Sequence, residues 1–173
     1  MWVYNALSRL DMNKEQRQIE VLASSLLEEY RIEQVIESLP RGYISVKQIA
    51  GHTYYYRQWR EGDKIISNYV PEAFLKGVKQ KIVIRKENEQ LLKITKKDIA
   101  KSTKAVLKAG LLSEEQIQAL REGVKNDDVK LEEREAFINK AFPNPNNATK
   151  KAMGYYVEGV ASYNDVLLAS WGL

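Results

Sequence analysis

The sequence predicts an α+β fold: a three-stranded antiparallel β-meander between two long helices, followed by a small all-α C-terminal module of about four short helices. Three observations lead to it. Two long stretches carry apolar residues at helical spacing, the segment between them is rich in β-formers and interrupted by glycine turns, and the last third contains repeated helix caps. We expect two domains, a long-helix and β-meander domain over residues 1–110 and a helical module over residues 111–173.

The first predicted helix runs from about Asn13 to Leu39. Asn13 can cap its N-terminus, Gln16 completes a capping box, and the segment from Pro40 to Gly42 ends it. The helix is acidic, because six glutamates oppose three basic side chains.

The β-meander is predicted from strands over residues 43–49, 53–60 and 64–70, with turns at residues 50–52 and 61–63. Three strands alone are marginally stable, so we expect one face of the sheet to pack on a helix. Alternation along the second strand places Tyr55 and Trp59 on one face, which we take as the packed one. Tyr54, Tyr56 and Arg60 would form an exposed platform on the other face, suited to nucleic-acid bases, a DNA backbone or a protein partner.

The second predicted helix spans residues 72–109, between Pro71 and a stop at Gly110. Residues 71–108 hold eleven basic and four acidic side chains. We expect the acidic first helix to lie antiparallel to this one and to neutralise its lysines in exposed ion pairs. The alternative is an electrostatic footprint for nucleic acid. A break near residues 86–89 and a dimeric coiled coil through this helix both remain open.

Four short helices are predicted in the C-terminal module. The first opens at a capping box that begins at Ser113 and runs to about Val124, and the second follows residues 126–128. The third covers residues 148–158, and Ser162 caps the last.

The composition argues against an enzyme. The chain has no cysteine, which excludes thiolate metal sites and a cysteine nucleophile, and its single histidine, His52, falls in a predicted turn. No glycine-rich phosphate loop or calcium loop occurs, so we expect no catalytic residue, metal or cofactor. The N-terminus lacks the pattern of a secretory signal and no apolar run is long enough for a membrane helix, so a cytoplasmic protein is expected.

The segment from Leu39 to Lys64 reads LPRGYISVKQIAGHTYYYRQWREGDK. It resembles a widespread bacterial domain of unknown function, in which a helix precedes a GYI…G…YYY meander and a charged helix follows. The resemblance covers roughly residues 20–100 and implies the fold without implying an activity.

The segment from Met153 to Val166 reads MGYYVEGVASYNDV. It looks like the closing segment of small antitoxins that inhibit Fic-domain adenylyltransferases, and the resemblance spans residues 114–171. Those antitoxins carry Ser or Thr four residues before a Glu-Gly or Glu-Asn pair, whereas this chain has Gln118 and Gly154 at these places. The resemblance implies a toxin-binding surface made of Glu122, Gly123, Met153, Tyr156, Glu158 and Gly159.

The leading hypothesis is therefore a non-enzymatic protein-binding regulator, antitoxin-like, with a Fic-type toxin as its partner and a homodimer as a further option. The alternative is a DNA-binding accessory protein of a mobile element. Its nucleic-acid surface would consist of Tyr54, Tyr56, Arg60, Lys64, Lys93, Lys97 and Lys101.

Overall fold

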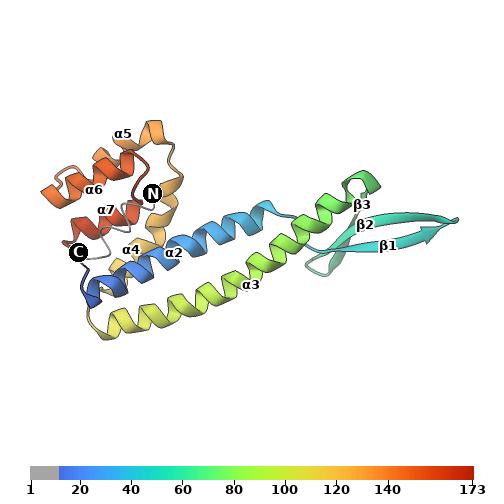
Figure 1. The fold of residues 1–173 in the computed structure, drawn as a ribbon, viewed down its shortest axis with the longest axis horizontal. Coiled ribbons are helices and arrows are strands. Elements are labelled where there is room, and N and C mark those ends of the chain that lie inside the picture. Colours follow the sequence, from blue (N-terminus) through green and yellow to red (C-terminus); the bar gives the residue numbers. More distant parts are fainter. Residues whose placement is uncertain (1–11) are drawn as a thin grey trace. The chain divides into compact units, whose positions relative to one another are not determined.

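The computed structural model describes residues 12–173 and has the predicted α+β fold. In chain order its elements are α2 (Lys14–Ser38), β1 (Tyr43–Ile49), β2 (His52–Glu61), β3 (Lys64–Val70), α3 (Glu72–Lys108), α4 (Glu114–Gly123), the 3₁₀ helix η1 (Val124–Asp128), α5 (Leu131–Ala141), α6 (Asn147–Val157) and α7 (Tyr163–Ser170) (Figure 1). Helix α3 is unbroken through residues 86–89, so the break considered there does not occur. The capping boxes predicted at Asn13 and Ser113 are both formed.

The described chain forms two compact units. Unit 1 consists of residues 12–30 and 96–173, and unit 2 of residues 31–95, so α2 and α3 each contribute to both. This differs from the predicted division at residues 110 and 111. The reason is that α4 and α7 bury apolar side chains against the long helices, so the C-terminal helices share a core with them.

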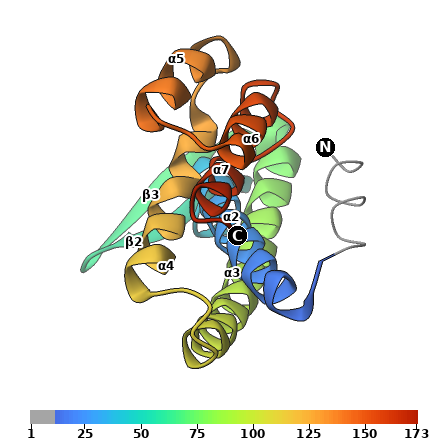
Figure 2. The ribbon, with the colours of Figure 1, turned by 90° about the vertical axis from the view of Figure 1, so that its left-hand side faces the viewer.

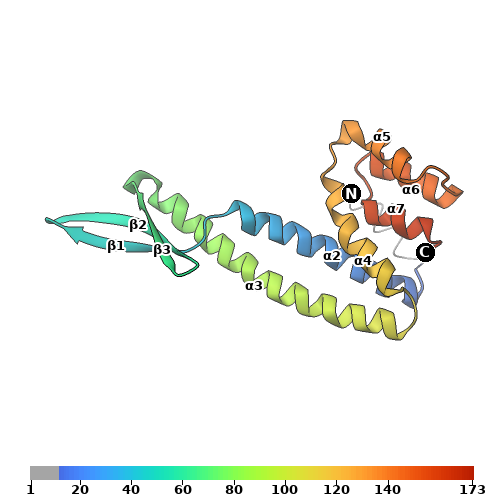
Figure 3. The ribbon, with the colours of Figure 1, turned by 180° about the vertical axis from the view of Figure 1, so that it is seen from behind.

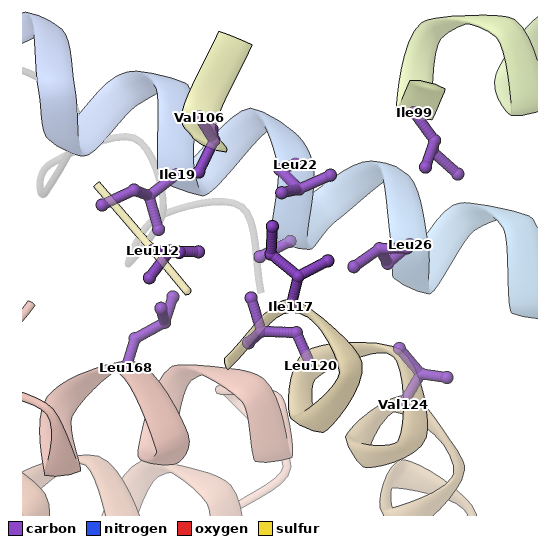
Figure 4. Packing of buried hydrophobic residues seen from close by; sticks show 11 residues of the cluster. Ile19, Leu22, Leu26, Ile99, Val106, Leu112, Ile117, Leu120, Val124 and Leu168 are labelled. Atoms are coloured by element: carbon purple, nitrogen blue, oxygen red, sulfur yellow. The ribbon is translucent and has the colours of Figure 1, made fainter. Parts of the chain in front are cut away.

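Unit 1 is held together by a core that joins four helices. Leu22 of α2, Val106 of α3 and Leu120 of α4 are fully buried at its centre, and Leu168 of α7 closes it (Figure 4). Figure 2 shows α7 in front of α2 and α4 beside it. Burying such a side chain contributes about 1.5–3 kcal/mol, so α4 and α7 depend on the long helices for their stability.

A second core cluster lies among α5, α6 and α7. Tyr156 is fully buried there, and its ring lies 6.1 Å from that of Tyr163, which also packs against Phe137 and Phe142. Arg134 of α5 binds this cluster together, because its guanidinium donates to the carbonyl oxygens of Asp127, Val129 and Tyr156 at 2.6–3.0 Å.

Unit 2 contains the sheet, with strand order β1-β2-β3 and both pairings antiparallel. The first hairpin turns at Ala50 and Gly51, whose φ angles of 50° and 79° fit a two-residue type I′ turn. The histidine predicted in this turn is instead the first residue of β2, where His52 pairs with Ile49. The second turn also has two residues, Gly62 and Asp63, because Glu61 pairs with Lys64.

The two long helices are joined to each other near the root of the sheet, the end at which the chain enters β1 from α2 and leaves β3 for α3. Arg85 of α3 donates to the carbonyl oxygens of Ile36 and, at 2.8 Å, Leu39, and so satisfies carbonyls at the C-terminal end of α2. Its Nε also contacts Glu89 at 2.9 Å. Arg85 is therefore engaged within the fold and is not part of a free basic surface.

Beyond this root the sheet is largely uncovered. Within unit 2 the β1–β2 hairpin extends away from the helices in two opposite views (Figures 1 and 3). Val46 on one face is 56% exposed and Tyr69 on the other is also 56% exposed. The prediction that one face of the sheet packs on a helix is wrong, since residues on both faces are exposed and no helix packs along the described sheet.

The predicted neutralisation of the α3 lysines by glutamates of α2 is seen at Glu29. Within unit 1, Glu29 contacts Lys96 at 3.9 Å and Arg121 of α4 at 3.0 Å. The other lysines of α3 are exposed along its length. Charge therefore divides between the units, because unit 2 holds twelve basic and seven acidic side chains, a net charge of +5.

Candidate nucleic-acid interface

One face of the sheet gathers tyrosines from two strands and a lysine from the third. The register places Tyr54 opposite Lys47 of β1, and Tyr56 opposite Tyr69 of β3. The Tyr69 ring lies 6.3 Å from that of Tyr54 and 5.9 Å from that of Tyr56, at tilted to edge-on angles. Lys47 Nζ lies 4.8 Å from the centre of the Tyr56 ring. We call Lys47, Tyr54, Tyr56 and Tyr69 the tyrosine face.

The tyrosine face is accessible to a ligand. Tyr54 and Tyr56 are half-buried, Lys47 is exposed, and Tyr43 at the end of the same face is 53% exposed. Exposed phenol rings can stack on planar bases, and an ammonium beside them can contact a phosphate. The arrangement therefore offers both kinds of contact that a nucleic acid makes with a sheet.

The opposite face of the sheet serves mainly to hold the unit together. The Arg57 guanidinium stacks 3.9 Å from the centre of the Trp59 ring and donates to the carbonyl oxygen of Arg41 at 3.0 Å. Val70 on this face is buried, and the indole Nε1 of Trp59 is enclosed without an acceptor in the described chain. These contacts give Arg57 a structural role at the root of the sheet.

The other residues predicted for a nucleic-acid surface do not join the tyrosine face. Arg60 shares its side of β2 but lies four residues from Tyr56, about 13 Å along the strand. Lys64 pairs with Glu61 and so belongs to the opposite face. Lys93 is exposed on α3, roughly 30 Å along the helix axis from the sheet end of that helix. Lys97 and Lys101 belong to unit 1. Within unit 2, Arg60 and Lys64 thus lie on opposite faces of the sheet, and the use of these residues in binding stays a prediction.

Sequence reasoning missed Lys47 and Tyr69. Both lie on neighbouring strands, and only the register shows that they face Tyr54 and Tyr56. Two-residue turns at Ala50-Gly51 and Gly62-Asp63 would have fixed that register. The missed signal was the turn length, because each turn was taken as three residues.

The residues predicted for partner binding in the C-terminal module separate into buried and exposed groups. Met153 is 8% exposed and Tyr156 is fully buried, so both are core residues in this conformation. Gly123 is buried as well, and a Cβ there would lie 2.4 Å from Oδ1 of Asn164. Its role is to let α4 approach α7 closely. These three residues are not retained as a contact surface.

The remaining three stand at or near the surface. Glu122 is exposed and accepts a hydrogen bond from Gln118 Nε2 at 2.8 Å. Glu158 is exposed at the end of α6. Gly159 has a φ of 73° and follows that helix as its stop, a backbone conformation that glycine adopts readily.

The buried tyrosine gives unit 1 a measurable pH dependence. Burial, with smaller effects of Asp127 and Tyr163, raises the pKa of Tyr156 to about 12, although the Arg134 charge opposes the rise. In the unfolded chain the phenol titrates near pH 10. Between these values the unfolded chain has lost a proton that the folded chain keeps, so the free energy of unfolding falls as pH rises.

We expect the thermal midpoint to be insensitive to this phenol below about pH 10 and to decline above it. Tyr156→Phe should make the decline of the thermal midpoint less steep. A smaller decline should remain, because the pKa of Tyr163 is also raised. Circular dichroism melts from pH 8 to 11.5 measure the slope of the thermal midpoint against pH. This slope reports the titration, whereas loss of the hydrogen bond from Tyr156 to the Asn126 carbonyl shifts the midpoint at every pH. Identical slopes in the two proteins would contradict the prediction.

Residues 12–173 contain no group of three His, Asp or Glu side chains that could hold a metal ion. None of the helices among them has the length and apolar character needed to cross a bilayer.

Part of the chain matches a family model. Residues 12–80 match a family model described as "Domain of unknown function (DUF6788)", which covers α2, the sheet and the first turns of α3. The search of curated proteins and the search of solved structures each found no match. The tyrosine face therefore lies inside a segment that matches a domain family of unknown function.

Proposed function

We propose that this chain is a non-enzymatic nucleic-acid-binding protein that holds a single strand on the tyrosine face. The observation that carries the proposal is the uncovered cluster of Tyr54, Tyr56 and Tyr69 with Lys47 beside it. In a merely structural sheet of this composition, such rings would be expected to pack beneath a helix.

The chemistry favours a single strand over a duplex. Tyrosine rings stack on unpaired bases, and each such contact contributes about 1–3 kcal/mol with little dependence on sequence. The bases of a duplex are already stacked on one another and present only their edges. The net charge of +5 on unit 2 adds long-range attraction for phosphates.

Replacing Tyr56 by leucine is expected to weaken binding of a fluorescently labelled single-stranded oligonucleotide by about 5- to 150-fold, because one stacking contact is lost. Fluorescence anisotropy at fixed salt measures the dissociation constant. Tyr55→Leu is the matched control, since Tyr55 is the next residue of β2 and faces the other side of the sheet.

The Lys47→Ala variant tests the phosphate contact separately. Its plot of log binding constant against log salt concentration should be shallower by about 0.7, the contribution of one phosphate in a single strand. The proposal fails if Tyr55→Leu weakens binding as much as Tyr56→Leu does. It also fails if a duplex of the same sequence binds more tightly than the single strand.

The second candidate function is the antitoxin-like regulator suggested by the C-terminal resemblance. One observation favours it: Glu122, the acid of the Glu-Gly pair, is exposed on α4 and available to a cationic group of a partner. This function requires a Fic-domain protein as the partner. Co-purification of the two chains is its direct test, and a Glu122→Gln variant that co-purifies equally well would argue against the assigned contact.

A further inference from the structure

Unit 1 carries a groove, whereas the tyrosine face belongs to unit 2. The groove has a volume of about 860 Å³ and is formed mainly by α3, with contributions from α2 and α4. Its lining residues are Glu29, Lys96, Ile99, Ala100, Thr103, Lys104, Leu107, Lys108 and Arg121.

The lining divides into an apolar floor and a charged rim. Ile99, Ala100, Thr103 and Leu107 recur at intervals of one, three and four residues, so they form a stripe along α3. Lys96, Lys104 and Lys108 of α3 and Arg121 of α4 surround this stripe. Such a combination suits an amphipathic ligand with apolar side chains on one side and negative charges at its edges.

The charges on the rim are only partly balanced within the unit. The carboxylate of Glu29 is 12% exposed and already contacts Arg121 at 3.0 Å and Lys96 at 3.9 Å. Lys104 and Lys108 are four residues apart, and the residues of α3 within one turn of either include no acid. Like charges at this spacing destabilise a helix by a few tenths of a kcal/mol, a cost that an acidic ligand would remove.

We propose that this groove binds an acidic amphipathic helix of a partner protein. Apolar side chains of that helix would cover Ala100 and Leu107, and its carboxylates would pair with Lys104 and Lys108. The distance along α3 from Lys96 to Lys108 is about 18 Å, so about 12 residues of helix span the groove, and a peptide of about 15 residues covers it with a short overhang.

A polynucleotide fits this groove less well. The floor is apolar, so phosphates would have to leave water beside Ala100 and Leu107 without a hydrogen bond in return. The Glu29 carboxylate lies among the rim cations and repels a phosphate backbone. An amphipathic peptide avoids both costs because it brings apolar side chains to the floor and places its few charges at the edges.

The test uses the full chain and a designed peptide of about 15 residues, with leucines at helical spacing on one face and glutamates elsewhere. A scrambled peptide of the same composition and a single-stranded oligonucleotide are the competitors. The double variant K104E/K108E should lose at least 10-fold in affinity for the designed peptide. The matched control K76E/K79E makes the same charge change at two exposed lysines of the same helix that belong to unit 2 and do not line the groove, and it should lose less than 3-fold.

A second variant tests the floor without changing the charge. Ala100→Gln places a larger polar side chain at an exposed helical position and should also weaken the designed peptide at least 10-fold. Three outcomes would overturn the proposal: the scrambled peptide or the oligonucleotide competing as well as the designed peptide, equal losses in the two double variants, or unchanged affinity in Ala100→Gln. Each outcome is independent of the tyrosine face, whose variants should leave peptide affinity unchanged.

Discussion

Replacing Gly42 by alanine is expected to unfold the sheet of unit 2. Gly42 precedes β1 with a φ of 104°, and a Cβ added there would lie 2.0 Å from the backbone oxygen of Gln58 in β2. The backbone strain costs about 1–3 kcal/mol, and the overlap with main-chain atoms adds about 1–3 kcal/mol more. A three-stranded sheet that packs little on helices is only marginally stable. This loss of stability should therefore cause local unfolding of the sheet.

Hydrogen exchange resolved by peptide measures this effect. Amides of β1, β2 and β3 should lose most of their protection in Gly42→Ala, while those of α5 to α7 keep theirs. Gly51→Ala is the matched control, because Gly51 also has a positive φ, 79°, but nothing within 4 Å of an added Cβ. It should cost only about 1–2 kcal/mol. Equal loss of protection in the two variants would show that steric contact with Gln58 is unimportant.

Replacing Arg134 by methionine is expected to destabilise unit 1 strongly. The side chain donates to three carbonyl oxygens, including Asp127 at 2.6 Å, and its guanidinium lies 4.5 Å from the centre of the Tyr156 ring. Methionine fills similar space but leaves three acceptors without their donor. Each unsatisfied acceptor costs about 1–3 kcal/mol when buried, and partial exposure reduces this, so about 2–5 kcal/mol is expected in total.

Urea unfolding followed by hydrogen exchange in α5, α6 and α7 tests this prediction. Arg134→Lys should recover only part of the loss, because one ammonium cannot reproduce the fork that reaches three carbonyls. Arg121→Met is the control: Arg121 is 44% exposed and pairs with Glu29, an arrangement that contributes about 0–1 kcal/mol. Comparable losses for Arg134→Met and Arg121→Met would mean that the three hydrogen bonds contribute little.

Local signals in the sequence were sufficient for the secondary structure. The predicted first helix over residues 13–39 agrees closely with α2, and the three strands agree within one residue of their bounds. These elements follow from caps, apolar spacing and β-forming residues, all of which act between neighbours in the chain. The turn at Ala50 was harder, because alanine is unusual at a positive φ and the Asn-Gly signature of a type I′ turn is absent.

The candidate sites depended on contacts between residues distant in sequence. Tyr54 and Tyr56 were identified from their strand, but Lys47 and Tyr69 joined them only through the register. Met153 and Tyr156 were predicted at a contact surface because a motif says nothing about burial, whereas the packing of α5, α6 and α7 encloses both.

The sequence alone determined the α+β class, the element order and the excess of positive charge near the middle of the chain. Each of these depends on residue type and short-range spacing. Tertiary structure alone decided that Arg85 and Arg134 are bound to backbone carbonyls, and that Lys104 and Lys108 border a groove. The physical reason is that the environment of a charged side chain is set by whichever distant segments fold around it. Spacing along the chain does not encode that environment.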